Sequence, residues 1–411
     1  MTTATGHTPI EEIDLGDMEL WEQGPPHAIF DRLRREAPIH WSPMDTWENE
    51  PGFWSITRAA DVRAISRDWE SFSSERGGVL ISDNSAPLEM QNAMFIGMDP
   101  PRHDKIKALF QRGFTPKRIS EHEVLIRGIT TSVLDRLDGL DEVNLVETLA
   151  QPVVARVIGS FLGIPEEDDA RWAELALRGL AVGDDSLQPG GDNEVIEEVL
   201  TKALALASER RINPTDDLTS VLVQAEIDGE QLTDFEAASG FALLVAAGMD
   251  STKATFSNGM LALLQNPEQR QKLIDDPSLI EAAVEEFLRM YPAFVNFRRT
   301  ATRDVEMHGQ TIREGDKVIL WYPASNRDEE VYECPHKLNV ERNPEHQAFG
   351  AGGRHFCLGS ALARAELKAL FEESLARYPQ MELIEDPEAV CSLMVNQPRE
   401  IRVKLGPRAD R

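Results

Sequence analysis

"FGAGGRHFCLG", residues 349–359, places four glycines, an arginine, a histidine and a cysteine directly ahead of a stretch with helical periodicity. A thiolate at a helix N-terminus is stabilised by the helix dipole and by free backbone N–H groups. The glycines let the backbone pass close to a flat partner and point N–H groups at the Cys357 sulfur. This loop therefore favours a ligand-binding or reactive cysteine over an inert buried one.

The surroundings of Cys357 narrow the kind of site. A structural zinc ion needs four ligands, and an iron–sulfur cluster takes several thiolates, so a lone cysteine suits neither. A single axial bond to a haem iron fits the pattern. A redox or nucleophilic cysteine also fits a helix start, and both interpretations stay open on this stretch alone.

Composition limits the function classes. The 411 residues allow one large domain or two to three smaller ones, and 71 acidic against 42 basic residues give a net charge of −29. Such a chain repels nucleic acid and anionic membranes. Three scattered cysteines, a polar start and no apolar run of eighteen residues predict a cytoplasmic protein without disulfides or a membrane span.

The hydrophobic pattern predicts a mainly α-helical chain with a minor β portion. Helical periodicity dominates from about 121 to 288. We expect a strand followed by a helix at 52–62, a hairpin and a further strand at 305–323, and an edge strand at 399–405. The stretch 183–193 is typical of a flexible connection between helices.

One long helix is predicted to run through the core. Thr233 and Glu236 form a capping box at its start, and Pro267 ends the run. Its middle is apolar nearly all round, yet it contains Asp250, and burying an acid is costly unless it is paired or hydrogen-bonded. Asp250 is either a structural carboxylate or part of a proton path, and Gly248 would let the helix open locally.

Further segments in the same order resemble the cytochrome P450 superfamily. The resemblance rests on the cysteine loop together with "DPPRHDKIK" (99–107), "AGMDST" (247–252), "EEFLR" (285–289), "RRTATRDVEMHG" (298–309) and "SNRDEE" (325–330). Glu286 and Arg289 lie one helical turn apart and can pair, with Arg342 as the expected third member of a buried cluster. The resemblance implies one P450 domain over 1–411, after a short polar segment of about 1–12. Its expected fold is a triangular helical bundle with the haem between the long central helix and the cysteine-loop helix.

The resemblance also implies a haem site and its chemistry. Haem b would be held by Cys357 as the axial thiolate and metal ligand, with its propionates neutralised by His103, Lys107, Arg299 and His355. Asp250, Ser251 and Thr252 would relay protons to bound oxygen. The thiolate favours O–O cleavage, so the implied activity is a monooxygenase that uses O₂.

Three positions depart from the family pattern. Phe349 lies one residue further from the cysteine than usual, so the loop has an extra glycine. Lys107 stands where arginine is usual and would act as a point charge rather than a fork. Ser251 follows the acid where threonine is usual, so we favour Ser251 as the relay hydroxyl and keep Thr252 as its alternative.

Electrons must come from a partner, because no flavin or iron–sulfur module fits in this length. Residues 102–118 carry six Lys/Arg and one Asp, and Arg354, Arg364 and Lys368 flank the cysteine side. A basic island on an acidic protein steers an acidic partner, so we expect a ferredoxin with its ferredoxin reductase. A monomer is the family default.

The resemblance places an apolar substrate above the haem. The expected lining residues are Leu243, Ala246, Ala247, Phe294 and Val295, with 77–96 as a lid. The whole chain is similar to actinobacterial enzymes acting on sterols, methyl-branched lipids and terpenoids, and it does not separate these substrates.

Three other functions are weighed against a monooxygenase. A peroxide-driven haem oxidase would not need the acid–alcohol pair. A haem-binding sensor or carrier would need neither a proton relay nor an electron-docking patch. A helical binding protein without haem is the last alternative, and the spectrum of the reduced carbon-monoxide adduct separates it from the others.

Overall fold

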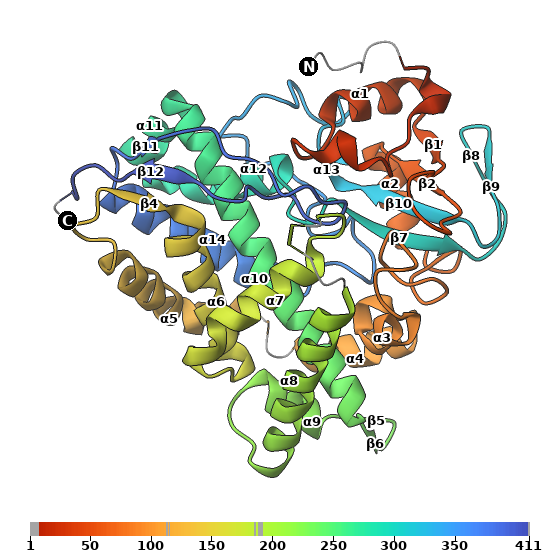
Figure 1. The fold of residues 1–411 in the computed structure, drawn as a ribbon, viewed down its shortest axis with the longest axis horizontal. Helices are drawn as coiled ribbons and strands as arrows, with labels where there is room; N and C mark the ends of the chain where they lie inside the picture. Colours follow the sequence, from red (N-terminus) through yellow and green to blue (C-terminus); the bar gives the residue numbers. More distant parts are fainter. Residues whose placement is uncertain (1–7, 112–113, 115, 185, 188–191, 410–411) are drawn as a thin grey trace.

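A helical body makes up most of the molecule, and a smaller part built around a sheet lies beside it (Figure 1). The computed structural model describes residues 8–111, 114, 116–184, 186–187 and 192–409. No helix within these ranges is long and apolar enough to cross a membrane. The expected mainly α-helical fold with a minor β portion is confirmed.

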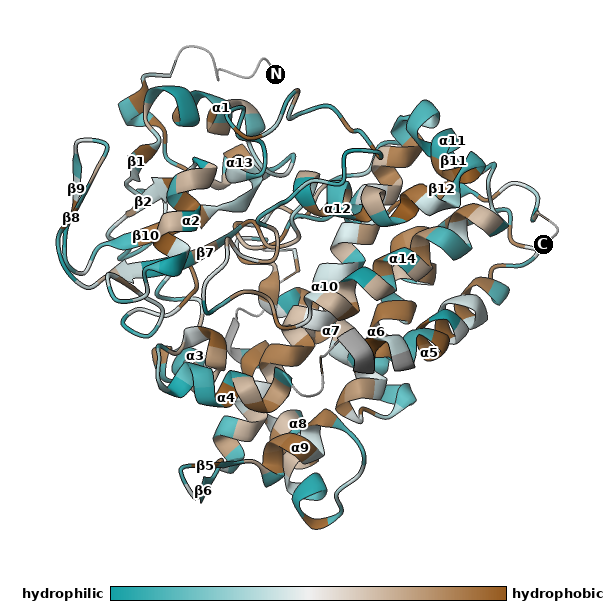
Figure 2. Cartoon of the chain, turned by 180° about the vertical axis from the view of Figure 1, so that it is seen from behind, coloured by the Kyte–Doolittle hydropathy of each residue, from teal (hydrophilic) through white to brown (hydrophobic). Residues whose placement is uncertain are grey.

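The helices follow one another along most of the chain. Their bounds are α1 His27–Glu36, α2 Ala59–Arg67, α3 Leu88–Ala93, α4 Arg102–Gln111, α5 Pro116–Asp135, α6 Gln151–Leu162, α7 Asp169–Leu180, α8 Asp192–Ile212, α9 Leu218–Gln224, α10 Asp234–Gln265, α11 Pro267–Asp275, α12 Ile280–Met290, α13 Tyr322–Ser325 and α14 Ser360–Arg377. Figure 2 shows brown, apolar segments alternating with teal, hydrophilic ones along several of these helices, and most apolar residues of α6 and α10 are buried. Burial of these faces supplies the main stabilisation of such a bundle.

Helix α10 crosses the core as predicted, and one expectation about it is wrong. Thr233 caps the helix, and Thr233 and Glu236 form the predicted capping box. The helix stays regular through Gly248 and does not open there. A Cβ at Gly248 would lie 2.8 Å from the Ile158 side chain. The glycine therefore provides room for close packing of α6 against α10.

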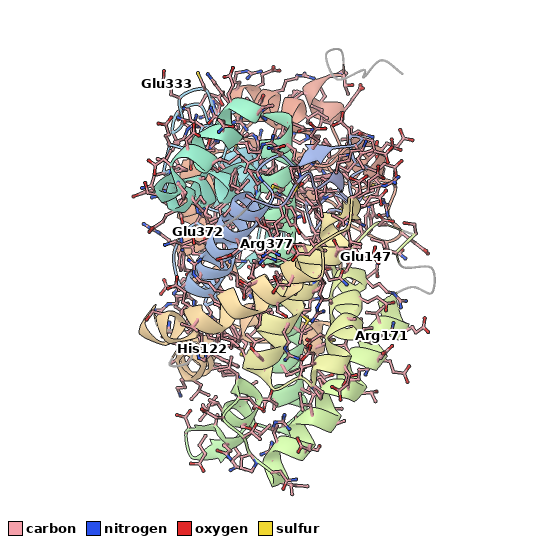
Figure 3. All side chains as sticks on the ribbon, turned by 90° about the vertical axis from the view of Figure 1, so that its left-hand side faces the viewer. His122, Glu147, Arg171, Glu333, Glu372 and Arg377 are labelled. Atoms are coloured by element: carbon pink, nitrogen blue, oxygen red, sulfur yellow. The ribbon has the colours of Figure 1, made fainter. Side chains whose placement is uncertain are left out.

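The helix that follows the cysteine loop, α14, lies side by side with α5. Figure 3 labels Glu372 and Arg377 on α14 at this contact. Glu372 pairs with Arg127 of α5, and Arg377 lies 2.7 Å from Asp135. The second half of α14, the helix that follows the cysteine loop, is thus anchored to the helical body.

The main sheet has the order β1-β2-β10-β7-β3. Its strands are β1 Ile39–Ser42, β2 Phe53–Ile56, β3 Phe72–Ser73, β7 Asn296–Ala301 and β10 Lys317–Trp321, and the hairpin strands β8 Val305–Met307 and β9 Gln310–Ile312 separate β7 from β10 in the chain. β10 pairs antiparallel with β7 and parallel with β2. The strand–helix unit at 52–62 and the hairpin at 305–323 are confirmed.

Two smaller sheets complete the β portion. One has the order β11-β12-β4, with β4 Glu142–Asn144, β11 Glu382–Leu383 and β12 Arg402–Lys404, and β5 Glu226–Ile227 pairs with β6 Glu230–Gln231 in the other. The expectation of an edge strand at 399–405 is wrong, because β12 has a partner on both sides. Its alternation arises because Val403 is buried while Arg402 and Lys404 are exposed.

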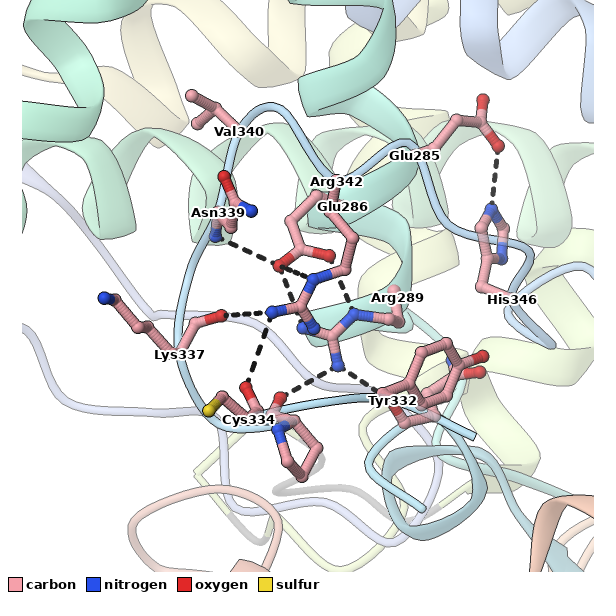
Figure 4. A network of polar contacts seen from close by, with 12 residues as sticks. Glu285, Glu286, Arg289, Tyr332, Cys334, Lys337, Asn339, Val340, Arg342 and His346 are labelled. Atoms are coloured by element: carbon pink, nitrogen blue, oxygen red, sulfur yellow. Dashed lines mark hydrogen bonds and ion pairs between the residues drawn. The ribbon is translucent and has the colours of Figure 1, made fainter. Parts of the chain in front are cut away.

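A buried ionic cluster fixes the segment that leads to the cysteine loop (Figure 4). Arg289 donates two hydrogen bonds to Glu286, at 2.7 and 2.9 Å, and Arg342 Nε lies 3.6 Å from the same carboxylate. The Asn339 backbone N–H also donates to Glu286. A buried ion pair is tolerated only when its remaining groups are hydrogen-bonded, and Arg289 meets that condition, because its Nη1 also donates to the Asn326 and Pro335 carbonyls. The predicted Glu–Arg–Arg cluster is present.

The stretch 183–193 connects α7 to α8, as expected. Residues 185 and 188–191 lie outside the described residues, so flexibility there stays a prediction. Of the described part, Asp184 pairs with Arg399 of the C-terminal segment. This contact joins the end of α7 to the segment that follows α14.

Candidate functional site

The cysteine loop has the backbone shape that its glycines predict. Gly352 and Gly353 take left-handed φ angles of +90° and +82°. A Cβ on Gly353 would lie 2.7 Å from the Ser66 carbonyl oxygen, so only glycine fits there. The Cys357 backbone N–H donates to the Phe349 carbonyl at 2.9 Å and closes the loop.

The Cys357 sulfur sits where backbone donors converge, just before α14 begins. Burial raises the pKa of the Cys357 thiol, while N–H groups of Gly359 and Ser360 and the charge of Lys107 lower it. The net direction is upward, so the protein alone keeps a thiol here. A metal ion deprotonates a coordinating thiol, and the donors around the sulfur then stabilise the thiolate.

A cavity opens between this loop and α10. Its lining combines the cysteine loop, basic side chains, hydroxyls and a large apolar wall. The lining includes Ser66, Phe95, Ile96, His103, Lys107, Phe114, Ile158, Phe161, Leu162, Leu218, Leu243, Leu244, Ala247, Gly248, Ser251, Thr252, Thr255, Leu288, Ala293, Phe294, Phe297, Arg299, Tyr322, His355, Cys357 and Glu366.

The four predicted propionate-binding side chains all line this cavity. The His103 and His355 rings are 4.2 Å apart at their centroids. Burial lowers the pKa of both histidines, and Arg299 lowers that of His355 further. Burial also lowers the pKa of Arg299. The Arg299 guanidinium makes one hydrogen bond within the described chain, from Nη1 to the Arg298 carbonyl at 2.7 Å.

Of these four groups, Arg299 and Lys107 donate only to backbone carbonyls within the described chain, whereas His103 Nδ1 lies 3.0 Å from Asp104 Oδ1. Glu366 is the one acidic residue among the lining residues of the described chain. Placing the cationic side chains of Arg299 and Lys107 at one cavity is unfavourable unless an anionic ligand enters. A flat group with two carboxylates and one metal ion matches both this donor set and the cysteine, so the residues fit haem b.

Lys107 lines the cavity and also fastens the cysteine loop. Its Nζ donates to the carbonyl oxygens of Arg354 and of Phe356, the latter at 2.7 Å. Burial lowers the pKa of Lys107. A lysine can hold two carbonyls and still turn a third N–H toward an anion.

Of the three predicted proton-relay residues on α10, two lie at the cavity wall and the third lies in the protein interior. Ser251 and Thr252 line the cavity, and Ser251 Oγ donates to the Ala247 carbonyl at 2.6 Å. Asp250 is not among the lining residues. Its carboxylate lies 2.5 Å from Lys253 Nζ and accepts from Gln397 Nε2 at 3.0 Å.

Three of the five predicted substrate-pocket residues line the cavity, namely Leu243, Ala247 and Phe294. Ala246 lies off the stripe of α10 that faces the cavity. Val295 is buried in a separate core cluster with Trp321 and Leu393. Neighbouring residues of an extended segment point to opposite faces, so Phe294 and Val295 cannot both reach the cavity. From the predicted lid, Phe95 and Ile96 line it.

Sequence reasoning missed Glu366 and Tyr322. Glu366 is fully buried in α14, and burial raises its pKa to about 8, opposed by the Thr252 hydroxyl. The signal was available, because Leu362, Glu366 and Leu370 are spaced by four residues and share one helix face. Tyr322 lines the cavity beside Arg299.

Several residues of the predicted basic island are paired with acidic residues, some of which come from other segments of the chain. Arg354 pairs with Asp104, and Arg102 pairs with Glu236. Arg364 and Lys368 lie near Glu285 and Glu281. Arg112 and the side chains of Lys117 and Arg118 lie outside the described residues. The described part is a mixed-charge surface around Phe356, whose side chain is 41% exposed.

Comparisons with known proteins agree with this geometry. Residues 193–404 match the family model for cytochrome P450. The methyl-branched lipid omega-hydroxylase of Mycobacterium tuberculosis is 36% identical, over 96% of this chain and 95% of that protein. The steroid C26-monooxygenase of Mycolicibacterium smegmatis is 31% identical, over 94% and 92%.

A solved structure extends the likeness to three dimensions. A Mycobacterium marinum cytochrome P450 in complex with pseudoionone superposes with a TM-score of 0.90 at 37% identity, covering 97% of this chain and 99% of that one. The chain therefore belongs to the cytochrome P450 family, and it is a monooxygenase whose cofactor is haem b bound through a cysteine thiolate.

Proposed function

We propose that this enzyme hydroxylates an apolar substrate of the lipid, steroid or terpenoid classes, using O₂ and electrons from a ferredoxin system. The apolar wall of the cavity carries this proposal. Its residues from α6, α10 and 293–297 are aliphatic, aromatic, glycine or hydroxyl-bearing. Such a wall favours a substrate without charge where it meets the protein. The names of the lipid and steroid hydroxylases among the relatives support the same class.

In the proposed site, Cys357 is the metal ligand and His103, Lys107, Arg299 and His355 hold the propionates. Haem bound through a thiolate supplies the activation of O₂ and the insertion of one oxygen atom into a C–H bond. The protein contributes the dry apolar cavity, the thiolate donors and the counter-charges. Burial makes each of these electrostatic contacts stronger than it would be in water.

We assign the proton relay to Ser251 and Thr252 at the cavity wall, with Asp250 behind them. Ser251 Oγ carries a proton that it donates to the Ala247 carbonyl, four residues earlier. Asp250 reaches the cavity only by exchanging its contact with Lys253 or Gln397. We expect Ser251→Ala to divert electrons into hydrogen peroxide, measured as product formed per NADPH consumed. If the product formed per NADPH falls in Thr252→Ala and not in Ser251→Ala, the relay hydroxyl is that of Thr252.

The electron donor is proposed to dock beside Phe356, because this exposed side chain adjoins the cysteine that holds the iron. Arg354, Arg364 and Lys368 surround this side of the molecule and offer charges to an acidic partner. Raising the salt concentration should then slow reduction by ferredoxin. A reduction rate that is independent of salt would contradict this docking surface.

One experiment tests the substrate class. The purified enzyme is supplied with ferredoxin, reductase, NADPH and ¹⁸O₂, and is given a methyl-branched fatty acid, a sterol or a terpenoid, each beside a charged compound of matched size. We expect one ¹⁸O atom in the product of an apolar member, and far less product from its charged counterpart. Turnover that occurs with hydrogen peroxide but not with the ferredoxin system would contradict the proposal. The absence of turnover with every apolar compound would also contradict it.

A further inference from the structure

Tyr322 follows β10 directly and lies on the side of the main sheet that carries Arg299. Val318 pairs with Arg299, and Leu320 pairs with Phe297. Side chains alternate along a strand, so Val318 and Leu320 point to the face that carries Phe297 and Arg299. Tyr322, the first residue of α13, packs in the same buried cluster as Val318 and Leu320, with Phe297 against it. The Tyr322 backbone N–H donates to the Val295 carbonyl at 3.0 Å, which continues this pairing just beyond β10.

The Tyr322 ring is well packed, but its hydroxyl has no hydrogen-bond partner within the described chain. The side chain is 2% exposed and lines the cavity. Its ring meets Phe297 edge-to-face, with centroids 6.2 Å apart. A hydroxyl at a cavity wall with no partner in the protein takes one from water or from a ligand, and phenylalanine would make the same ring contacts without that need. The hydroxyl therefore points to a ligand that accepts a hydrogen bond.

The charges around Tyr322 identify the kind of acceptor. Burial raises the pKa of the Tyr322 hydroxyl, with Arg299 opposing the shift, so the group remains an O–H donor at neutral pH. Arg299 also presents donors to the cavity, and it has one hydrogen bond, to the Arg298 carbonyl. Two unsatisfied donors of this kind beside each other call for one anionic acceptor between them.

We propose that the Tyr322 hydroxyl and the Arg299 guanidinium bind the same carboxylate of the cofactor, a haem propionate. The inference rests on the haem assignment of the proposed function. Tyr322 is then a cofactor-binding residue beyond the four that the sequence motifs indicate. It anchors the edge of the porphyrin to the start of α13, directly after β10, as well as to β7.

Two properties depend on this hydrogen bond. A hydrogen bond to a carboxylate is stronger than one between neutral groups, so its loss should speed haem dissociation by about tenfold. The donor also offsets the negative charge of the propionate. Without it, the ferric state gains stability, and the reduction potential of the haem should fall.

Haem transfer to excess apomyoglobin, followed by the Soret band, measures the first property. We compare wild type, Tyr322→Phe and the control Tyr332→Phe, whose hydroxyl donates to the Glu345 carbonyl at 2.7 Å and does not line the cavity. Faster transfer and a lower potential in Tyr322→Phe alone support the inference. Wild-type values for both in Tyr322→Phe would overturn it.

A second pair of variants at position 322 keeps the inference testable if Tyr322→Phe folds poorly. Tyr322→Gln keeps a donor and Tyr322→Leu has none at similar size, so the Gln variant should retain haem longer. Equal transfer rates for this pair would overturn the inference. A failure of the proposed function is distinguishable, because wild type would then lack the thiolate-type spectrum of the reduced carbon-monoxide adduct.

Discussion

Asp250 and Glu366 are both buried carboxyl groups near the same cavity, and their surroundings differ in kind. Asp250 is 1% exposed, and its two oxygens contact Lys253 and Gln397. Glu366 is equally buried, yet neither oxygen has a hydrogen-bond partner of good geometry within the described chain. The first is an ion pair and the second a neutral acid at pH 7, because burial raises the pKa of Glu366 to about 8.

The comparison teaches that the partner, rather than burial itself, sets the state of an acid. A buried charge persists when an opposite charge and hydrogen bonds satisfy it. Lys253 supplies that charge from one turn along the same helix, with a side chain that is 2% exposed. Glu366 has Leu362 and Leu370 one turn away on either side. Substitutions at the two sites should therefore have different consequences: at Asp250 the loss of a partner lowers stability, and at Glu366 the loss of the acid changes how stability depends on pH.

The largest effect is expected from Lys253→Met, which leaves Asp250 without its counter-charge. Breaking a buried pair by removing one partner costs about 3–5 kcal/mol. The free energy of unfolding, measured by denaturant titration of the holoenzyme, should fall by that amount. Lys272→Met is the control, since Lys272 pairs with Glu341 at the surface and such pairs contribute about 0–1 kcal/mol. Equal losses in the two variants would show that Asp250 does not depend on Lys253.

Glu366→Gln should change how stability depends on pH. The folded-state pKa of Glu366 is about 8, above its ordinary value of 4.5, so between these values the folded state keeps a proton that the unfolded state has released. Stability from this group is present below pH 4.5 and is lost as pH rises toward 8, at about 1.4 kcal/mol per pH unit.

The measurement is the difference in unfolding free energy between wild type and Glu366→Gln across this pH window. The variant should gain on wild type steadily as pH rises. Glu281→Gln, at an exposed position with a side chain that is 83% accessible, is the control and should show no such trend. A flat difference for Glu366→Gln would mean that the acid is ionised in the folded protein.

The smallest effect is expected from Gln397→Leu. This change removes one hydrogen bond to the Asp250 carboxylate and leaves Lys253 in place. Hydrogen bonds to charged groups contribute about 1.5–3 kcal/mol, so we expect a loss near the lower end in the same titration. Gln265→Leu removes an exposed contact to Asp386 and should have almost no effect. A loss as large as that of Lys253→Met would make Gln397 the main partner of Asp250.

Much of the fold and the chemistry could be read from local sequence signals. The glycines before Cys357, the capping box at Thr233 and the Glu286–Arg289 spacing each act within a few residues of chain. The apolar run of α10 also predicted its central position. These features are local or strongly periodic, so one sequence specifies them.

The features that were missed depend on residues distant in the chain. Asp250 is joined to Gln397, which lies 147 positions further on. Gly248 serves the packing of Ile158 from another helix. β12 lies between two strands rather than at an edge because β4, far earlier in the sequence, pairs with it. Such contacts follow from the assembled core, and no local pattern carries them.

The central claim is that Cys357 holds the haem iron as a thiolate, and the absorption spectrum of the reduced carbon-monoxide adduct tests it most directly. We predict a strongly red-shifted Soret band for wild type and for Cys334→Ser and Cys391→Ser, whose side chains do not line the cavity. Cys357→Ser should lose that band together with substrate oxidation. A Cys357→Ser protein that keeps the red-shifted band would contradict the account.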